Sequence, residues 1–245
     1  MVDGGSSDKT LDLVRNEEKA IIIDDSSGNR ATARQKGIQK VDTRFFAFVD
    51  SDVILCNRWH EYAWRQVGQK TGAVWGVALP LRTEEQKYYG QLVRLRAASN
   101  VAELIMKTGG YLLHDTLIRY EAVESIRIPS ALHVREDYFI GMYITNRGYE
   151  WIRSYEPYCW HDTQTSARDI PNDMILWGQI DRLMNWTTTD QVFGRVARSF
   201  VLSILLRIMS AGSKEPNGIL RNQILFVKGW LSVNPAKIGR KSIVV

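Results

Sequence analysis

Hydrophobic and polar positions in the first 165 residues switch repeatedly between the spacing of helices and that of strands. Helices are expected at 8–18, 29–40, 57–70, about 83–107, near 116–125, and in a segment that ends at Asn146. Strands are expected at 19–23, 45–49, 73–79 and 149–160. Helices and strands that alternate in this way predict an α/β domain.

The segment FFAFV at 45–49 predicts a strand near the centre of the sheet. Its five residues are all apolar, so both faces of the strand need to be covered. That pattern is typical of a parallel strand with helices on each side. We therefore expect a mixed, mostly parallel sheet flanked by helices.

From about residue 166 the pattern changes to helices without clear strands. Apolar residues between 192 and 208 recur at helical spacing and form one stripe, while Arg195, Arg198 and Arg207 lie off it. We expect a catalytic-type domain at 1–165 and a basic, helical C-terminal region at 166–245.

The distribution of charge sharpens this division. The chain has 245 residues and a formal net charge of +5. Residues 1–190 carry 23 basic and 26 acidic side chains, whereas residues 191–245 carry nine basic side chains and one acidic one, a net charge of +8. A basic region of this kind favours an anionic partner, either a membrane surface or nucleic acid.

The composition is that of a soluble globular protein, with 44% hydrophobic and 24% charged residues. The two cysteines, Cys56 and Cys159, are too few for a disulfide scaffold and are expected to be reduced. No apolar run approaches the ~18 residues of a membrane-spanning helix, and no signal peptide is recognised. We expect a cytoplasmic protein that is at most peripheral on the inner face of the cell membrane.

The acidic pair Asp50 and Asp52 is the first candidate for chemistry, because it directly follows the apolar strand at 45–49. In open α/β sheets, ligands bind at the carboxyl ends of strands. Two carboxylates there can hold a divalent cation that also binds a diphosphate. An isolated Asp-x-Asp is more often a solvated turn, so this interpretation needs support from elsewhere in the chain.

Three further features supply that support. The opening VDGGSSDKT places Asp3 at a strand end before small residues and a helix, as in a nucleotide-binding turn. The segment ATARQKGI places Arg34 on a helix that leads into the acidic strand. Gly109–Gly110 is a candidate for a sugar pocket and Glu136–Asp137 for a carboxylate base. Each feature alone is better explained by ordinary structure, such as a capped turn or a helix N-terminus.

In this order and spacing, the segments resemble the motifs of the family 2 glycosyltransferases, which have the GT-A fold of nucleotide-diphospho-sugar transferases. VDGGSSDKT is similar to the family's V-D-D/G-G-S-x-D-x-T turn, and ATARQKGI to its A-R-N-x-G helix, with Gln35 in place of Asn. FFAFVDSDVIL resembles the strand with the DxD motif, and REDYFIGMYITNRGYE resembles the E-D helix followed by R-x-G-Y. The resemblance covers residues 1–165.

The resemblance implies a metal-dependent, inverting hexosyltransferase with a UDP- or GDP-sugar as donor. Asp3 would bind the base or ribose of the nucleotide with Arg34 close by, and Asp50 would lie beside the ribose and the metal. Asp52 would ligate Mg²⁺ or Mn²⁺ across the diphosphate. His161, which follows the last expected strand, is a further candidate ligand.

The resemblance also implies how the acceptor is activated. Asp137 would be the general base that deprotonates the acceptor hydroxyl, with Glu136 in support. The transition state would resemble an oxocarbenium ion. The implied acceptor is a glycan or a lipid-linked molecule, and a lipid-linked acceptor would suit a membrane-surface role for residues 191–245.

Departures from the family pattern leave other interpretations open. Family members usually have a strand and a helix before the V-D-G-G-S turn, whereas Met1 falls within the strand of that turn. We therefore expect a family member that is truncated at its N-terminus, and a non-catalytic fragment or relic is the alternative. The Q-x-x-R-W signature of processive members is incomplete, because Leu183 follows Gln179 and Arg182. Nucleic acid is not an expected partner, since only the C-terminal charge favours it and no RNA or DNA motif is present.

Overall fold

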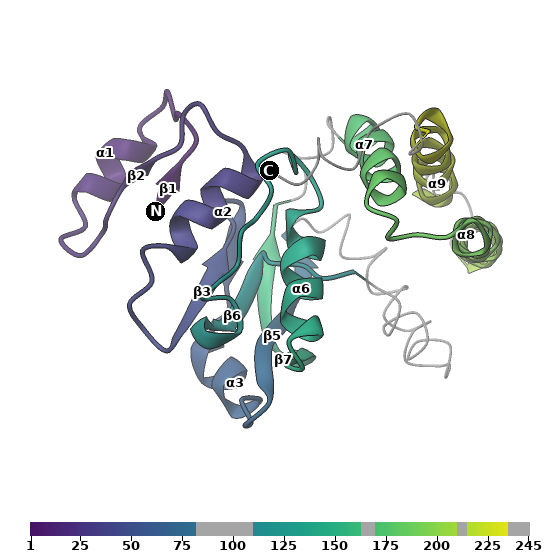
Figure 1. The fold of residues 1–245 in the computed structure, drawn as a ribbon. Helices are drawn as coiled ribbons and strands as arrows, with labels where there is room; N and C mark the ends of the chain where they lie inside the picture. Colours follow the sequence, from purple (N-terminus) through teal and green to yellow (C-terminus); the bar gives the residue numbers. More distant parts are fainter. Residues whose placement is uncertain (82–109, 163–169, 210–214, 235–245) are drawn as a thin grey trace. The chain divides into compact units, whose positions relative to one another are not determined.

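The computed structural model describes residues 1–81, 110–162, 170–209 and 215–234 (Figure 1). The chain divides into two compact units, which are residues 1–79 with 110–161 and residues 80–109 with 162–244. We call them the first and the second unit and describe each by itself. The helix expected at 83–107 lies outside the described residues.

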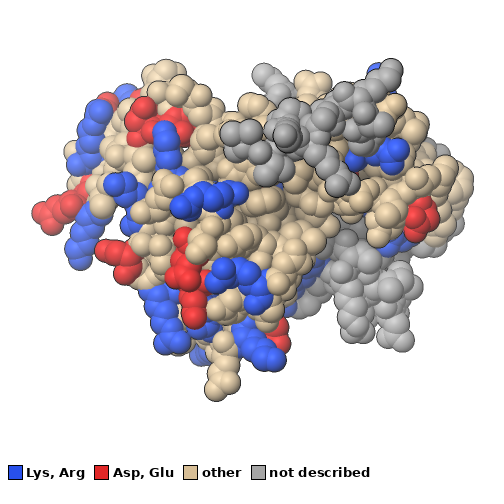
Figure 2. Space-filling view, viewed as in Figure 1, with Lys and Arg blue, Asp and Glu red and all other residues tan. Residues whose placement is uncertain are grey.

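The strands of the first unit form two sheets. The larger sheet has the strand order β3–β6–β5–β7–β4. Its strands are β3 (Phe45–Val49), β4 (Val53–Leu55), β5 (Thr71–Pro80), β6 (Asp115–Arg119) and β7 (Glu150–His161). The smaller sheet consists of β1 (Val2–Asp3) and β2 (Ile23–Asp24), which pair in parallel. On the face shown in Figure 2, the acidic and basic side chains of this unit are interspersed.

The mixed α/β class is confirmed, but the expected predominance of parallel pairing needs correction. β3 pairs with β6 in antiparallel register, and so do β5 with β6 and β4 with β7. β3 lies at one end of the strand order, and Val49 is 45% exposed. A short run of apolar residues does not distinguish such an end strand from a central parallel strand, and the prediction failed for that reason.

β6 also corrects the helix expected near 116–125. Asp115–Arg119 forms a strand between β3 and β5, and η1 (Tyr120–Ala122) follows it as one 3-10 turn. The buried guanidinium of Arg119 donates from Nε to the carbonyl of Thr71 and from Nη2 to that of Gly68, both at 2.7 Å. The strand was not predicted because the polar residues of this segment, which usually face solvent, are buried and hydrogen-bonded inside the fold.

The helices of the first unit are α1 (Thr10–Arg15), α2 (Arg30–Ile38), α3 (Trp59–Arg65) and α6 (Glu136–Asn146). α2 begins with a capping box, in which the Asn29 side chain accepts from the Ala31 and Thr32 backbone and Thr32 Oγ1 accepts from Asn29 N–H. The helix expected at 29–40 is therefore confirmed over Arg30–Ile38. α6 is followed by Gly148 at φ +84°, the left-handed conformation that a glycine allows after a helix.

The second unit contains α7 (Ile170–Leu183), α8 (Thr189–Met209) and α9 (Glu215–Ser232) among its described residues. α9 packs against both other helices, and Val192, Phe226 and Trp230 form a buried core. The single apolar stripe expected on α8 is divided, since Val192 is 4% exposed whereas Phe193 is 69% exposed. Among the described helices, none has both the length and the apolar character needed to cross a membrane.

Candidate active site

The acidic pair lies in a tight turn between β3 and β4. The Asp50 N–H donates to the carbonyl of His114 at 3.1 Å, and the Asp50 carbonyl accepts from the N–H of Val53 at 3.2 Å. The Asp50 side chain is 38% exposed and that of Asp52 is 27% exposed. The backbone around the pair is therefore held in place while both carboxylates remain partly exposed to solvent.

Arg34 links the end of β3 to the beginning of α6. Its Nη2 lies 3.1 Å from Asp50 Oδ1, and its Nε lies 3.1 Å from Glu136 Oε1. The guanidinium also lies 4.9 Å from the centroid of the Phe48 ring. Burial lowers the pKa of Arg34, but the charges of Asp50 and Glu136 raise it above its ordinary value. Arg34 is thus a fixed cation between two carboxylates that are 86 residues apart in the chain.

Asp137 stands at the first turn of α6, next to Glu136. The pKa of Asp137 is raised from 3.8 to about 6, mainly by burial and also by the neighbouring charge of Glu136, while Arg135, the Tyr138 N–H and Arg34 oppose the shift. Arg135 has φ +71°, so the chain enters α6 through a left-handed residue. A carboxyl group with this pKa is largely ionised at neutral pH but keeps more basicity than an exposed aspartate.

Asp52 and His161 meet on neighbouring strands. The register of β4 and β7 pairs Val53 with His161, and His161 Nε2 lies 3.2 Å from Asp52 Oδ2. Carboxylates suit Mg²⁺ and Mn²⁺, and imidazole is a common ligand of transition-metal ions. The side chains present are therefore compatible with a divalent cation at this position, for which Asp52 and His161 would be the protein ligands, with Asp50 beside them.

The remaining expected residues are placed differently. Both Asp3 oxygens accept hydrogen bonds from its own turn, including Gly5 N–H at 2.9 Å and Ser6 N–H at 3.1 Å. The Ser6 hydroxyl, together with these N–H groups, lowers the pKa of Asp3. Gly110 accepts from Arg153 Nη2 through its carbonyl at 2.8 Å, and Gly109 lies outside the described residues. The structure brings together Arg34, Asp50, Glu136, Asp137, Asp52 and His161, whereas it records no hydrogen bond from Asp3 to any of these described residues.

Residues that the sequence analysis did not single out lie next to this site. His114, Asp115 and Cys159 are all buried, and one ligand-type atom from each lies within 4.8 Å of the other two. The ring of His114 is stacked on that of His161 at 5.8 Å. The only signal in the sequence was the polar pair His114–Asp115 in an otherwise apolar stretch, and that pair has no ligand spacing of its own.

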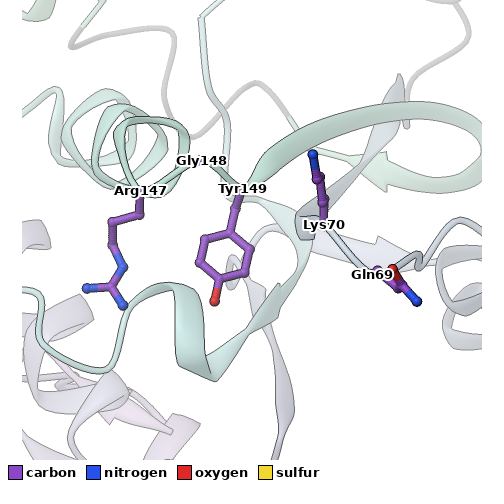
Figure 3. A pocket seen from close by; sticks show the side chains of 5 residues that line it. All are labelled: Gln69, Lys70, Arg147, Gly148 and Tyr149. Atoms are coloured by element: carbon purple, nitrogen blue, oxygen red, sulfur yellow. The ribbon is translucent and has the colours of Figure 1, made fainter.

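A separate pocket of about 310 Å³ lies at the other end of α6. It is lined by Gln69, Lys70, Arg147, Gly148 and Tyr149 (Figure 3). Figure 3 shows the Lys70 and Arg147 side chains pointing in different directions, so the two cations do not converge on one point. This pocket is not part of the acidic site, because α6 separates its lining residues from Asp137.

Carboxylates at the ends of strands, a carboxyl group with a raised pKa at a helix N-terminus, and a cation between them are typical of the ligand site of an α/β enzyme. The family model described as Glycosyl transferase family 2 matches residues 1–126, which is just over half of the chain, and the chain belongs to that family. The resemblance found in the sequence is thereby confirmed. No curated protein matches the chain.

The match includes Asp3, Arg34, Asp50 and Asp52. Glu136, Asp137 and His161 lie beyond its last residue, so their association with the site rests on the geometry alone: Arg34 contacts Glu136, and His161 contacts Asp52.

Proposed function

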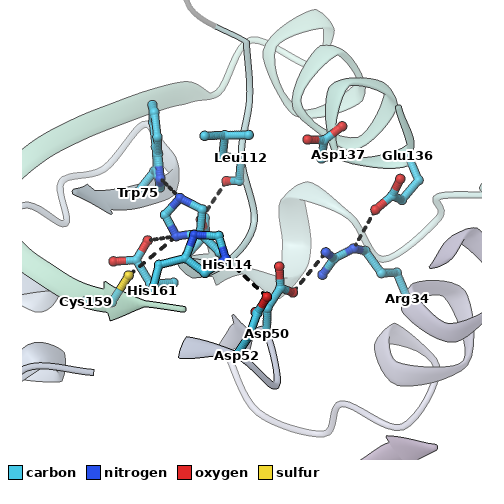
Figure 4. A network of polar contacts seen from close by, with 12 residues as sticks. Arg34, Asp50, Asp52, Trp75, Leu112, His114, Glu136, Asp137, Cys159 and His161 are labelled. Atoms are coloured by element: carbon cyan, nitrogen blue, oxygen red, sulfur yellow. Dashed lines mark hydrogen bonds and ion pairs between the residues drawn. The ribbon is translucent and has the colours of Figure 1, made fainter. Parts of the chain in front are cut away.

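We propose that this protein transfers a sugar from a nucleotide-diphospho-sugar to an acceptor hydroxyl, with inversion at the anomeric carbon and with the help of Mg²⁺ or Mn²⁺. The observation that carries the proposal is the pair of ion pairs made by Arg34, at 3.1 Å each, which hold the end of β3 beside the first turn of α6. This arrangement brings the acidic pair of the DxD segment and a basic carboxylate into one site (Figure 4). Family membership supports the reaction class.

Asp137 is the proposed general base. An acceptor hydroxyl must lose its proton as the new glycosidic bond forms, and a positioned carboxylate takes that proton. In an inverting displacement this base lies on the face of the sugar opposite the leaving group. Burial raises the pKa of Asp137 to about 6, which strengthens it as a proton acceptor while leaving it ionised at neutral pH.

Asp52 and His161 are the proposed ligands of the cation, with Asp50 beside them. A bound divalent cation supplies positive charge for the departing diphosphate. Arg34 and Glu136 orient the groups around it, because the guanidinium fixes the Asp50 carboxylate on one side and the Glu136 carboxylate on the other. Glu136 is 4% exposed, so its proposed role is to position Arg34 and it is not expected to contact the substrate.

The experiment that tests this function is transfer and hydrolysis from a panel of UDP- and GDP-sugars with Mn²⁺ or Mg²⁺ present. We expect turnover of at least one donor that is abolished by chelation and lost in Asp52→Asn and Asp137→Asn. Asp42→Asn, an exposed aspartate between α2 and β3, is the matched control and should turn over normally. Failure to bind or turn over any nucleotide sugar would contradict the proposal and favour a non-catalytic member of the family.

We further infer that the second unit meets an anionic membrane surface at the cytoplasmic face, where a lipid-linked acceptor would be found. On α8, Phe193, Phe200, Val201 and Ile204 are exposed along one side of the helix. Residues 191–245 carry a net charge of +8. Exposed apolar side chains with basic neighbours are typical of a helix that lies in the membrane interface. Salt-sensitive sedimentation with phosphatidylglycerol vesicles tests this part, and no binding at low salt would contradict it.

A further inference from the structure

The buried trio His114, Asp115 and Cys159 has the residue types of a metal site, but its hydrogen bonds point to another role. Trp75 Nε1 lies 3.2 Å from His114 Nε2, and an indole nitrogen is a donor only. Nε2 of His114 is therefore the acceptor, and Nδ1 carries the proton of the neutral ring. A ring nitrogen that carries a proton cannot ligate a metal. The trio is thus better explained as a hydrogen-bonded support.

Nδ1 of His114 is directed toward the other two members of the trio. It lies 3.7 Å from Cys159 Sγ and 2.8 Å from Asp115 Oδ1, although its N–H is not aligned well enough with Oδ1 for a regular hydrogen bond. Trp59 Nε1 donates to Asp115 Oδ2 at 3.2 Å, deep in the core. Trp75 on β5 and Cys159 on β7 therefore contact the His114 ring directly, while Trp59 on α3 holds the Asp115 carboxylate beside it.

His114 contacts both Asp50 and His161 in the acidic site. Its carbonyl accepts the N–H of Asp50 at 3.1 Å, and its ring is stacked on His161, with 5.8 Å between centroids and 25° between planes. His161 Nε2 in turn lies 3.2 Å from Asp52 Oδ2. One residue thus supports the backbone of one carboxylate and the imidazole that faces the other (Figure 4).

We propose that His114 is a positioning residue for the cation site of Asp50, Asp52 and His161, with Trp75 as the group that fixes its ring. The inference rests on the proposed function, because it assumes a cation at Asp52 and His161. Groups that hydrogen-bond to a metal ligand alter metal affinity by roughly 10–100-fold when they are removed. His114 contacts His161 by ring stacking and Asp50 through its backbone carbonyl, so we expect an effect at the lower end of that range. His114 itself is not expected to touch the cation or the donor.

The test is Mn²⁺ affinity, measured by titration of the full chain and followed by the electron paramagnetic resonance signal of free Mn²⁺. We expect His114→Phe, which keeps the stacked ring and the backbone carbonyl but removes the nitrogens that fix the orientation of the ring, to weaken Mn²⁺ binding by up to roughly tenfold. His114→Asn keeps an N–H donor near the position of Nδ1 and should recover part of that loss. Trp75→Phe should weaken binding in the same direction but less, and it provides the test if His114→Phe does not fold. Trp64→Phe, on the exposed part of α3, should leave Mn²⁺ affinity unchanged.

Two results would overturn the inference. The first is a folded His114→Phe and a folded Trp75→Phe that both bind Mn²⁺ as the wild type does, while Asp52→Asn does not bind. The second is a metal that stays bound in Asp52→Asn and is lost in Cys159→Ser, which would make the trio a metal site after all. If the wild type itself binds no Mn²⁺, with or without UDP or GDP, the proposed cation site and this inference both fail.

Discussion

Around the acidic turn of the first unit, charged side chains are buried and paired, whereas one side of α8 in the second unit exposes several large apolar side chains. Glu136 is 4% exposed and Asp115 is fully buried, and both lie beside the acidic turn that follows β3. On α8, by contrast, Phe193 is 69% and Phe200 is 53% exposed. Burying a charge is costly unless the charge is paired and hydrogen-bonded, and a contiguous exposed apolar patch is typical of an interaction surface. The comparison therefore agrees with the proposed roles, which are catalysis in the first unit and contact with a surface through α8 in the second.

The buried charge at Asp137 gives the largest predicted effect. Asp137→Asn should lower the transfer rate by about 10²–10⁴-fold, because a general base is lost, while leaving donor binding intact. Turnover and donor affinity measured on the same preparation check this. Normal turnover with weakened donor binding would instead assign Asp137 to the donor site.

The same substitution should stabilise the fold, which separates a catalytic from a structural role. Because the pKa of Asp137 rises from 3.8 to about 6 on folding, its ionised form costs up to about 3 kcal/mol at pH 7. The native state binds more protons than the unfolded state between these values, so this cost appears as the pH rises through them. Denaturant unfolding of Asp137→Asn should therefore show a gain at pH 7 that disappears below about pH 4. A loss of stability at pH 7 would mean that the carboxylate supports the fold.

Replacing the central cation should cost stability as well as activity. Arg34→Gln leaves the buried Glu136 carboxylate without its partner, and breaking a buried pair in this way costs about 3–5 kcal/mol. Arg15→Gln, whose pair with Asp12 is exposed, is the matched control and should change unfolding very little. Equal losses of unfolding free energy in Arg34→Gln and Arg15→Gln would contradict the claim that Arg34 holds the buried Glu136 carboxylate.

The smallest effect on the unfolding transition is expected from a substitution on the exposed side of α8. Phe200→Ser should weaken sedimentation with anionic vesicles while leaving the unfolding transition unchanged, because the ring is exposed. Phe226→Ala on α9, which is 2% exposed, should destabilise the protein by about 3–5 kcal/mol. Unfolding by Phe200→Ser without any vesicle binding by the wild type would show that this side of α8 packs within the protein.

The sequence predicted the elements that carry the site better than it predicted the sheet around them. The helix expected at 29–40 and the strands expected at 45–49 and 149–160 are present, because their local signals are strong. The antiparallel pairing of β3 with β6 was missed, since pairing depends on residues that are far apart in the chain, such as Phe45 and Arg119. β6 was read as a helix because its polar residues are satisfied only by partners in the tertiary fold.

For the candidate site, the sequence predicted the acidic residues but not His114 and Trp75, which lie next to them. Asp50, Asp52, Asp137 and Arg34 follow from motifs at strand and helix ends, where short segments carry the signal. His114 and Trp75 become visible only when β5, β6 and β7 lie side by side, because no local pattern marks a histidine that orients another histidine. The roles assigned to these residues remain predictions until their variants are measured.

The pH dependence of kcat/KM for sugar transfer, in the wild type and in Asp137→Asn, tests the account most directly. For the wild type we expect kcat/KM to fall as the pH decreases through about 6, because Asp137 must be ionised to accept the proton of the acceptor. For Asp137→Asn we expect a rate lower by about 10²–10⁴-fold and without that acid limb. A variant with the rate and the pH profile of the wild type would contradict the assignment of Asp137 as the base.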